Sequence, residues 1–222
     1  MSSPKVFRQI RFEAPPGATE LLLVRHGESE AVVTGEPVPL FEGHGDPPLS
    51  EVGREQAELV GARLASEPID AIYVTTLQRT VQTAAPLAAR LGIEPRVERD
   101  LREVHLGEWE AGLFRQKTHE RDPLAVRMWT EQSWGVIPGA ERDADFFARV
   151  RAGLERVVDA HPDQLVAVVA HGGTIGALLS QATGSRPFAF VGSDNASISS
   201  LVVSGEQWIL RRFNDTVHLE PT

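Results

Sequence analysis

The chain has 222 residues, of which 41% are hydrophobic and 24% are charged, and its formal net charge is -9. These proportions are typical of a globular protein with a sizeable core, so they exclude a chain that is mainly disordered. The densest apolar runs, at residues 21–24 and 165–170, are far shorter than the roughly 18 residues of a membrane-spanning helix. The acidic balance opposes binding to nucleic acid or to anionic membranes, and we expect neither as a partner.

The start of the chain has no apolar segment of the kind that directs secretion, which predicts a cytoplasmic protein. It has no cysteine, so disulfides, thiolate nucleophiles and cysteine-bound zinc are excluded. Histidine, carboxylate and hydroxyl side chains remain as the candidate reactive groups.

The first half of the chain alternates short apolar runs with helical periodicity. Residues 1–19 are predicted to be an N-terminal extension, in which residues 6–12 form an edge strand. A strand buried on both faces is predicted at 21–24, and a helix begins after Ser50 and ends before Pro68. A second buried strand is predicted at 71–74, followed by a helix over 79–91.

Residues 104–143 differ from their surroundings, because they combine many charges with three tryptophans and a Pro-Gly turn. They are predicted to form a partly helical lid insertion, in which Trp109, Trp129 and Trp134 pack as core side chains. A helix over 144–159, a strand over 165–170, a helix over 174–182 and a terminal strand pair at 197–203 and 208–213 are predicted next.

This order of elements predicts an α/β fold, a three-layer sandwich with a mostly parallel central sheet and helices on both faces. Residues 20–222 are expected to form one domain that carries the lid insertion.

Two histidines follow predicted buried strands. An Arg-His-Gly-Glu segment at residues 25–28 comes directly after the first strand, and His171-Gly172-Gly173 comes after the strand at 165–170. Because ligands bind at the carboxyl ends of parallel strands, His26 and His171 are expected to face one crevice. The glycines let backbone approach a ligand, and the helix that follows Gly173 attracts an anion. The expected guest is an oxyanion.

Two arginines and one carboxylate are predicted to reach the same sheet edge. Arg79 begins the helix after the strand at 71–74, and with Arg25 it supplies two planar guanidinium groups suited to bidentate phosphate binding. Glu103 follows another short segment that ends at this edge. Each residue alone is typical of a protein surface, and it is the set that indicates a site.

The segments 25–29, 79–84, 101–110 and 171–173 together resemble the four signature blocks of the histidine phosphatase superfamily, with its phosphoglycerate mutase-like fold. The resemblance spans roughly residues 20–215 in the expected order. It implies that His26 is a nucleophile that becomes phosphorylated and that Arg25, Arg79 and His171 bind the phosphoryl group. It also implies that Glu103 is the proton donor. The implied reaction is phosphomonoester hydrolysis on a small-molecule substrate, with no metal or other cofactor, in a monomer or homodimer.

The sequence departs from the family pattern at two positions. Val32 stands where the family often has an asparagine. The segment 41–50 resembles a substrate loop, so Glu42 and Gly43, with Gly172, are expected to contact the substrate. Mutases carry threonine or serine where this chain has Glu42, and a carboxylate there repels the carboxylate of phosphoglycerate.

The paired arginines that mutases use downstream of the acid are also not evident in residues 104–143. Hydrolysis is therefore favoured over phosphoglycerate mutase-type transfer, which remains an alternative. A catalytically weak phosphate-binding protein is another alternative, suggested by Val32.

Two further questions stay open at this level. A metal site is an alternative, because four residues supply mixed nitrogen and oxygen donors, although two nearby arginines oppose a cation. Those residues are His26, Glu28, His44 and Asp46. The basic side chains of the insertion either cap the mouth of the site or face solvent. They are Arg115, Lys117, His119, Arg121 and Arg127.

Overall fold

The computed structural model describes residues 5–220, so residues 1–4 of the predicted extension lie outside the described part of the chain. A six-stranded sheet forms the centre, with the strand order β5-β4-β6-β1-β7-β8. The strands are β1 (Thr19–Arg25), β4 (Ile69–Val74), β5 (Arg96–Val97), β6 (Leu165–Ala170), β7 (Ile198–Ser204) and β8 (Gln207–Asp215). Neighbours from β5 to β1 pair in parallel, whereas β7 and β8 pair antiparallel.

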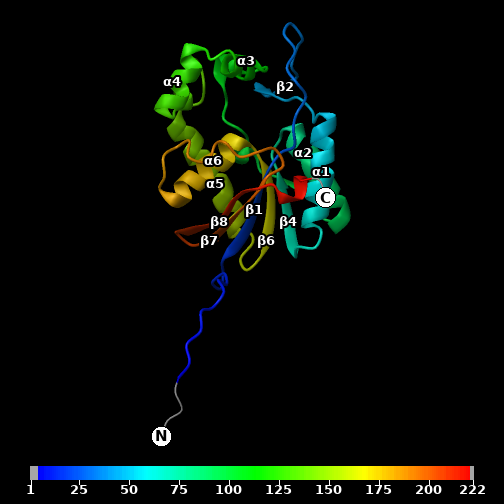
Figure 1. Ribbon diagram of the computed structural model, residues 1–222, viewed down its shortest axis with the longest axis vertical. Helices are drawn as coiled ribbons and strands as arrows, with labels where there is room; N and C mark the ends of the chain where they lie inside the picture. Colours follow the sequence, from blue (N-terminus) through cyan, green and yellow to red (C-terminus); the bar gives the residue numbers. More distant parts are fainter. Residues whose placement is uncertain (1–4, 221–222) are drawn as a thin grey trace.

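Helices cover both faces of this sheet, which confirms the predicted α/β fold class (Figure 1). One face packs against α1 (Glu51–Leu64) and α2 (Gln78–Leu91), and the other against α5 (Asp143–Asp159) and α6 (Gly172–Thr183). Successive residues of β1 point to opposite faces of the sheet. Leu23 therefore packs in the core beneath α5 and α6, and Val24 packs in the core beneath α1 and α2. Burial on both faces explains why residues 21–24 of β1 and all of β6 are hydrophobic.

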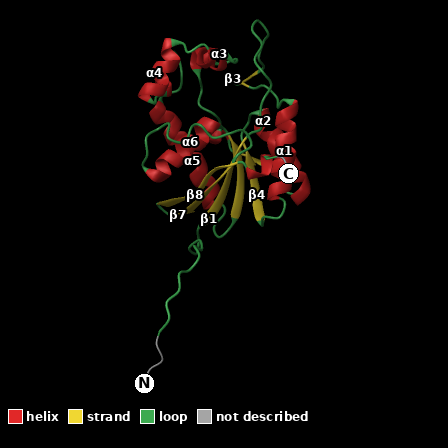
Figure 2. Ribbon diagram, viewed as in Figure 1, coloured by secondary structure: helices red, strands yellow, loops and turns green. Residues whose placement is uncertain are grey.

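The lid insertion lies over the carboxyl ends of the strands and is partly helical, as predicted (Figure 2). It contains α3 (Leu113–His119), α4 (Pro123–Glu131) and two short 3-10 turns, η2 (Gly107–Trp109) and η3 (Trp134–Val136). Trp109 and Trp134 are buried in the core, which confirms their predicted role, whereas Trp129 is 42% exposed. A small hairpin of β2 (Leu40–Phe41) and β3 (His44–Gly45) lies near the lid.

The local signals at α1 are confirmed, because the Ser50 hydroxyl accepts a hydrogen bond from the Gly53 amide and caps the helix. Short 3-10 turns also occur at η1 (Arg99–Leu101) and η4 (Val217–Leu219). None of the helices in the described residues is long and apolar enough to cross a membrane.

The predicted edge strand at residues 6–12 is wrong. This segment has no strand pairing and leads away from the body at the end opposite α3 and α4 (Figure 1). Its apolar side chains are exposed, including Phe7 at 89% and Ile10 at 93%. The segment has no clear period in its sequence, and a strand needs a partner edge, whereas this segment pairs with neither β5 nor β8.

Candidate active site

The ends of two neighbouring strands bring His26 and His171 together. Arg25 ends β1 and Ala170 ends β6, and these residues are directly paired in the parallel register. The next residue of each strand is therefore carried to the same edge, and the two imidazole rings lie 5.3 Å apart between centroids. The predicted convergence of the two histidines is confirmed.

The guanidinium groups of Arg79 and Arg25 flank His26. Arg79 lies in the first turn of α2, and its Nε donates to His26 Nε2 at 3.3 Å. A second nitrogen of Arg79 donates to the Gly45 carbonyl at 2.9 Å. Arg25 donates to the Ser193 carbonyl, and its Nε has no hydrogen-bond partner among the described residues. These arginines place two positive charges beside one buried ring.

Hydrogen bonds assign a neutral tautomer to His26. Its Nδ1 lies 2.7 Å from the Gly27 carbonyl, which can only accept, so Nδ1 carries the hydrogen. Nε2 then presents a lone pair on the side of Arg79. Burial, Arg79 and Arg25 hold the pKa of His26 well below its usual value of 6.5. The ring is therefore neutral and carries an unprotonated Nε2.

Close backbone packing supports this ring. A Cβ at Gly27 would lie 2.5 Å from the Gly53 carbonyl oxygen of α1, so only glycine permits this approach. On the other side, the Asn195 amide donates to the His26 carbonyl at 2.9 Å. Contacts from α1 and from Asn195, which are distant in the sequence, thus fix the backbone on both sides of His26.

His171 is fully buried and does not line the cavity next to His26. Its Nε2 is 3.0 Å from the Thr75 hydroxyl, and that hydroxyl is 3.1 Å from the Thr80 hydroxyl. Its Nδ1 has no partner among residues 5–220. Burial and the charge of Arg79 hold the pKa of His171 well below its usual value, so this ring is neutral too.

The Glu103 carboxylate lies at the N-terminus of α6, and Glu103 lines the same cavity as His26. Its carboxylate accepts hydrogen bonds from the Gly173 amide at 3.0 Å and from the Thr174 amide at 3.1 Å. A Cβ at Gly173 would overlap this carboxylate, which explains the glycine there. Arg149 of α5 donates to the carbonyls of residues 100, 102 and 103 and holds this segment in place.

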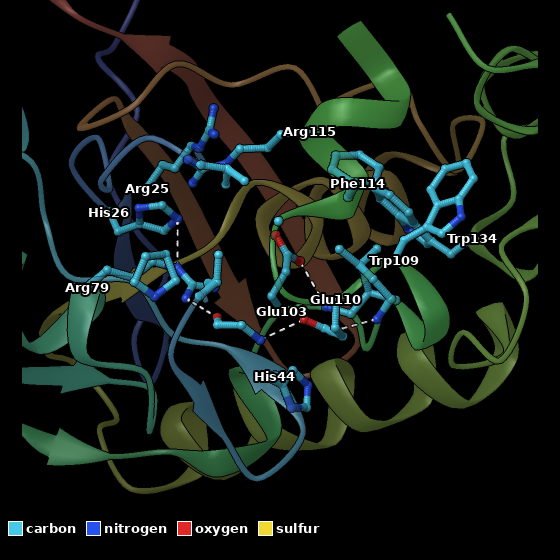
Figure 3. A pocket seen from close by; sticks show the side chains of 17 residues that line it. Arg25, His26, His44, Arg79, Glu103, Trp109, Glu110, Phe114, Arg115 and Trp134 are labelled. Atoms are coloured by element: carbon cyan, nitrogen blue, oxygen red, sulfur yellow. Dashed lines mark hydrogen bonds between the residues drawn. The ribbon is translucent and has the colours of Figure 1, made fainter. Parts of the chain in front are cut away.

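These groups face one cavity of about 250 Å³ beneath the lid (Figure 3). Arg25, His26, Arg79 and Glu103 line one part of it. The rest is mostly apolar, and its largest side chains are Trp109, Phe114 and Trp134. Val32, at the position of the family asparagine, also lines the cavity and packs close to Gly112. A cavity lined by Arg25, Arg79, the neutral His26 ring and Glu103 can hold a tetrahedral oxyanion.

Besides His171, three residues predicted to contact the substrate lie outside the cavity lining. Glu42 instead forms ion pairs with Arg99 and Arg102, each at 2.7 Å. Gly43 packs near the His105 ring, and a Cβ at Gly172 would lie 3.4 Å from Arg25 Nε. Gly172 therefore neighbours the phosphate-binding candidates, whereas Glu42 belongs to a surface ion-pair cluster.

The four residues weighed as metal ligands do not form a metal site. Across residues 5–220 there is no group of three or more His, Cys, Asp and Glu side chains arranged to hold an ion. Glu28 accepts from the Ser50 hydroxyl, and Asp46 accepts from the Gln78 amide.

The lid supplies residues that sequence patterns left open or missed. Arg115 lines the cavity, and it donates to the Ser29 hydroxyl at 2.6 Å and to the Glu30 carbonyl at 2.8 Å. In contrast, Lys117 and Arg127 are paired with Asp122 and Glu131 on the lid itself. His44, Glu110 and Phe114 also line the cavity. His44 lies in the flagged segment 41–50 and Glu110 in the signature block 101–110, whereas no sequence pattern indicated Phe114.

The two buried neutral histidines predict that the protein loses stability in mild acid. Their folded pKa values lie below the unfolded value of 6.5, so the unfolded chain binds protons first as the pH falls. Between pH 7 and pH 5 we expect the free energy of unfolding to fall by up to about 2 kcal/mol for each ring. Urea unfolding at several pH values measures this. A His171→Gln variant should show a shallower slope, and an equal slope would contradict the prediction.

Removing the partner of His171 should also destabilise the fold. In Thr75→Val the shape is kept but the buried Nε2 loses its hydroxyl, which we expect to lower the free energy of unfolding by about 1–3 kcal/mol. Thr75→Ser retains the hydroxyl and serves as the matched control. Equal stability of the valine and serine variants would show that this hydrogen bond contributes nothing.

Comparison with known proteins identifies the family. Residues 21–216 match the family model of the histidine phosphatase superfamily, branch 1. The chain is 35% identical over 204 residues to phosphoserine phosphatase 1 of Hydrogenobacter thermophilus, covering 90% of this chain and 94% of that protein. It is 33% identical over 208 residues to phosphoglycerate mutase-like protein 4 of Arabidopsis thaliana, covering 91% and 88%.

A solved structure agrees with this assignment. The structure of a mycobacterial glucosyl-3-phosphoglycerate phosphatase superposes with a TM-score of 0.74 at 30% identity. The superposition covers 90% of this chain and 100% of that chain. The match covers most of the chain, including every element that carries the site, and the protein belongs to branch 1 of the histidine phosphatase superfamily.

Proposed function

We propose that this protein is a phosphomonoester hydrolase that works through a phosphohistidine on His26, with Glu103 as the general acid and base. The observation that carries the proposal is the convergence on one cavity of an unprotonated His26 Nε2, the guanidinium groups of Arg25 and Arg79, and the Glu103 carboxyl group.

The proposed reaction has two displacements at phosphorus. His26 Nε2 attacks the phosphoryl group while the bond from phosphorus to the alcohol oxygen breaks, and protonated Glu103 gives its proton to the leaving alcohol. Water then attacks the phosphohistidine, Glu103 takes a proton from the water, and inorganic phosphate leaves with neutral His26 restored. Arg25 and Arg79 bind the phosphoryl oxygens, where charge is concentrated in the transition state. His171 supports the same group from its buried position beside His26.

Two features favour hydrolysis over phosphoryl return to a sugar acid. Phosphoglycerate carries a carboxylate that needs a cation, and both Arg99 and Arg102 near the substrate loop are already paired with Glu42. The names of two relatives, a phosphoserine phosphatase and a glucosyl-3-phosphoglycerate phosphatase, point the same way. A mutase-like relative keeps transfer as the alternative to be tested.

Product analysis tests this proposal. Incubation with 3-phosphoglycerate and with a panel of other phosphomonoesters should release inorganic phosphate and form no 2-phosphoglycerate. Interconversion of the two phosphoglycerates would establish the mutase alternative. Phosphate binding with no turnover and no phosphoprotein across the panel would instead establish a binding protein.

Removal of divalent metal ions should leave the activity unchanged. The proposed steps use only imidazole, guanidinium and carboxyl groups, and two arginines flank the reacting ring. We expect kcat/KM after exhaustive chelation with EDTA to match that of untreated enzyme. A loss that is restored by added zinc or manganese would contradict the proposed chemistry.

A further inference from the structure

The cavity continues beyond the phosphoryl site into a region enclosed by aromatic rings. Trp109, Phe114 and Trp134 lie together on one side of Glu103, opposite Arg25 and His26 (Figure 3). The Phe114 ring is 6.4 Å from that of Trp109 and 6.0 Å from that of Trp134 between centroids. Leu106 and Val104 add further apolar surface. We call the region lined by these five residues the aromatic end.

The charged groups near the aromatic end do not suit a substrate whose alcohol part carries a negative charge of its own. Glu110 lines the cavity, and its oxygens accept from the Leu106 amide at 2.8 Å and the Gly45 amide at 2.7 Å. A substrate carboxylate placed there would meet this carboxylate and would lose its water without gaining a cation. His44, which also lines the cavity, has a pKa lowered by burial and by Arg102, so it is neutral as well.

The third arginine of the cavity lies elsewhere. Arg115 is beside Arg25 in Figure 3, away from the three rings, and its hydrogen bonds go to Ser29 and Glu30. Its positive charge therefore lies on the side of the cavity where Arg25 and Arg79 would bind the phosphoryl group. The described residues lining the aromatic end include no lysine or arginine.

We propose that the aromatic end binds the alcohol part of the substrate and selects an uncharged, apolar group, such as an aryl or short branched alkyl chain. This rests on the proposed function, because it assigns the leaving group of that same reaction. The cavity volume of about 250 Å³ accommodates a phosphoryl group together with a single ring, since a cavity of about 150 Å³ already holds benzene. The inferred substrates differ from those in the names of the two phosphatase relatives.

Binding of stable phosphonates tests the preference without requiring turnover. By calorimetry we expect 2-phenylethylphosphonate to bind about 10-fold to 100-fold more tightly than methylphosphonate, because its ring leaves water. 3-Phosphonopropionate, which carries a carboxylate, should bind no more tightly than methylphosphonate. If the carboxylate compound equals or exceeds the phenyl compound, or if none of the three binds, the inferred selectivity is overturned.

Three variants locate the preference. In Phe114→Ala, the difference in binding free energy between 2-phenylethylphosphonate and methylphosphonate should fall to about half of its wild-type value or less. The affinity for methylphosphonate itself should not change, which would show that the phosphoryl-binding residues are intact. Trp129→Ala is the control, because Trp129 is an exposed ring of α4 that does not line this cavity. Phe114→Leu keeps an apolar side chain and should retain most of the preference. An undiminished preference in Phe114→Ala would place the selectivity elsewhere.

Turnover separates this inference from the proposed function. 2-Phenylethyl phosphate and ethyl phosphate have leaving alcohols of similar acidity, so a difference in kcat/KM reports binding of the tail and not leaving-group chemistry. We expect a difference of at least about 10-fold in favour of the phenyl ester. Equal rates would overturn the selectivity but leave hydrolysis in place. Absence of any turnover, with the phosphonate order as expected, would overturn hydrolysis and leave the selectivity in place.

Discussion

Replacing His26 with alanine is expected to lower kcat/KM for phosphomonoesters by at least about 1,000-fold, because the proposed covalent route then has no nucleophile. Wild-type enzyme that is mixed with a labelled phosphomonoester and quenched in alkali should carry a label that is stable to base and labile to acid. The variant should carry none. Arg25 and Arg79 remain in His26→Ala, so phosphate binding should largely persist even though turnover is lost.

The matched control for this experiment is His218→Ala. His218 lies in η4 and lines neither of the two hollows that contain His26. Its replacement should leave both the labelling and the kcat/KM unchanged. Undiminished turnover by His26→Ala would refute the proposed mechanism, in which His26 is the nucleophile.

Replacing Glu103 with glutamine should produce a loss that depends on the leaving group. Alkyl phosphates need a proton on the departing oxygen, so we expect kcat/KM to fall by about 100-fold to 10,000-fold. 4-Nitrophenyl phosphate releases a stable anion without that proton, and its kcat/KM should fall much less. Because Glu103 is also the proposed base for water attack, the phosphohistidine should accumulate in the variant with this aryl ester.

Glu108→Gln is the control for Glu103→Gln. Glu108 lies in the same segment of chain, but its side chain is exposed and does not line the cavity. It should behave as wild type with both classes of ester. An equal loss for alkyl and aryl esters in Glu103→Gln would indicate that this carboxylate only supports the structure at the N-terminus of α6, where it binds two amides.

The sheet and the meeting of the two histidines follow from short-range signals in the sequence. Continuous apolar runs identified β1 and β6, and parallel neighbours in a sheet align their carboxyl ends. The residue after each strand is then carried to one edge whatever the rest of the chain does. The sequence also indicated that Gly27 and Gly173 permit a close approach of the backbone. It did not show that the groups that approach them are the Gly53 carbonyl of α1 and the Glu103 carboxylate.

The local sequence misjudged the N-terminal segment. Residues 6–12 show no clear period and were interpreted as an edge strand, yet pairing depends on where the chain enters β1 and on whether an edge is within reach. Glu42 was likewise expected at the substrate because of its neighbours in sequence. Its actual partners, Arg99 and Arg102, lie 57 and 60 positions away, and no local pattern reports such a distance.

The sequence by itself determined the layered fold and singled out the two histidines, Arg25, Arg79 and Glu103, because they stand in or near the ends of regular elements. Only the tertiary structure decided what surrounds them in the cavity. The lid has weak periodicity, and its direction over the site depends on how Trp109 and Trp134 pack into the core. That packing turns Phe114 toward the cavity and brings Arg115 beside Arg25, and both placements depend on contacts between segments far apart in the chain.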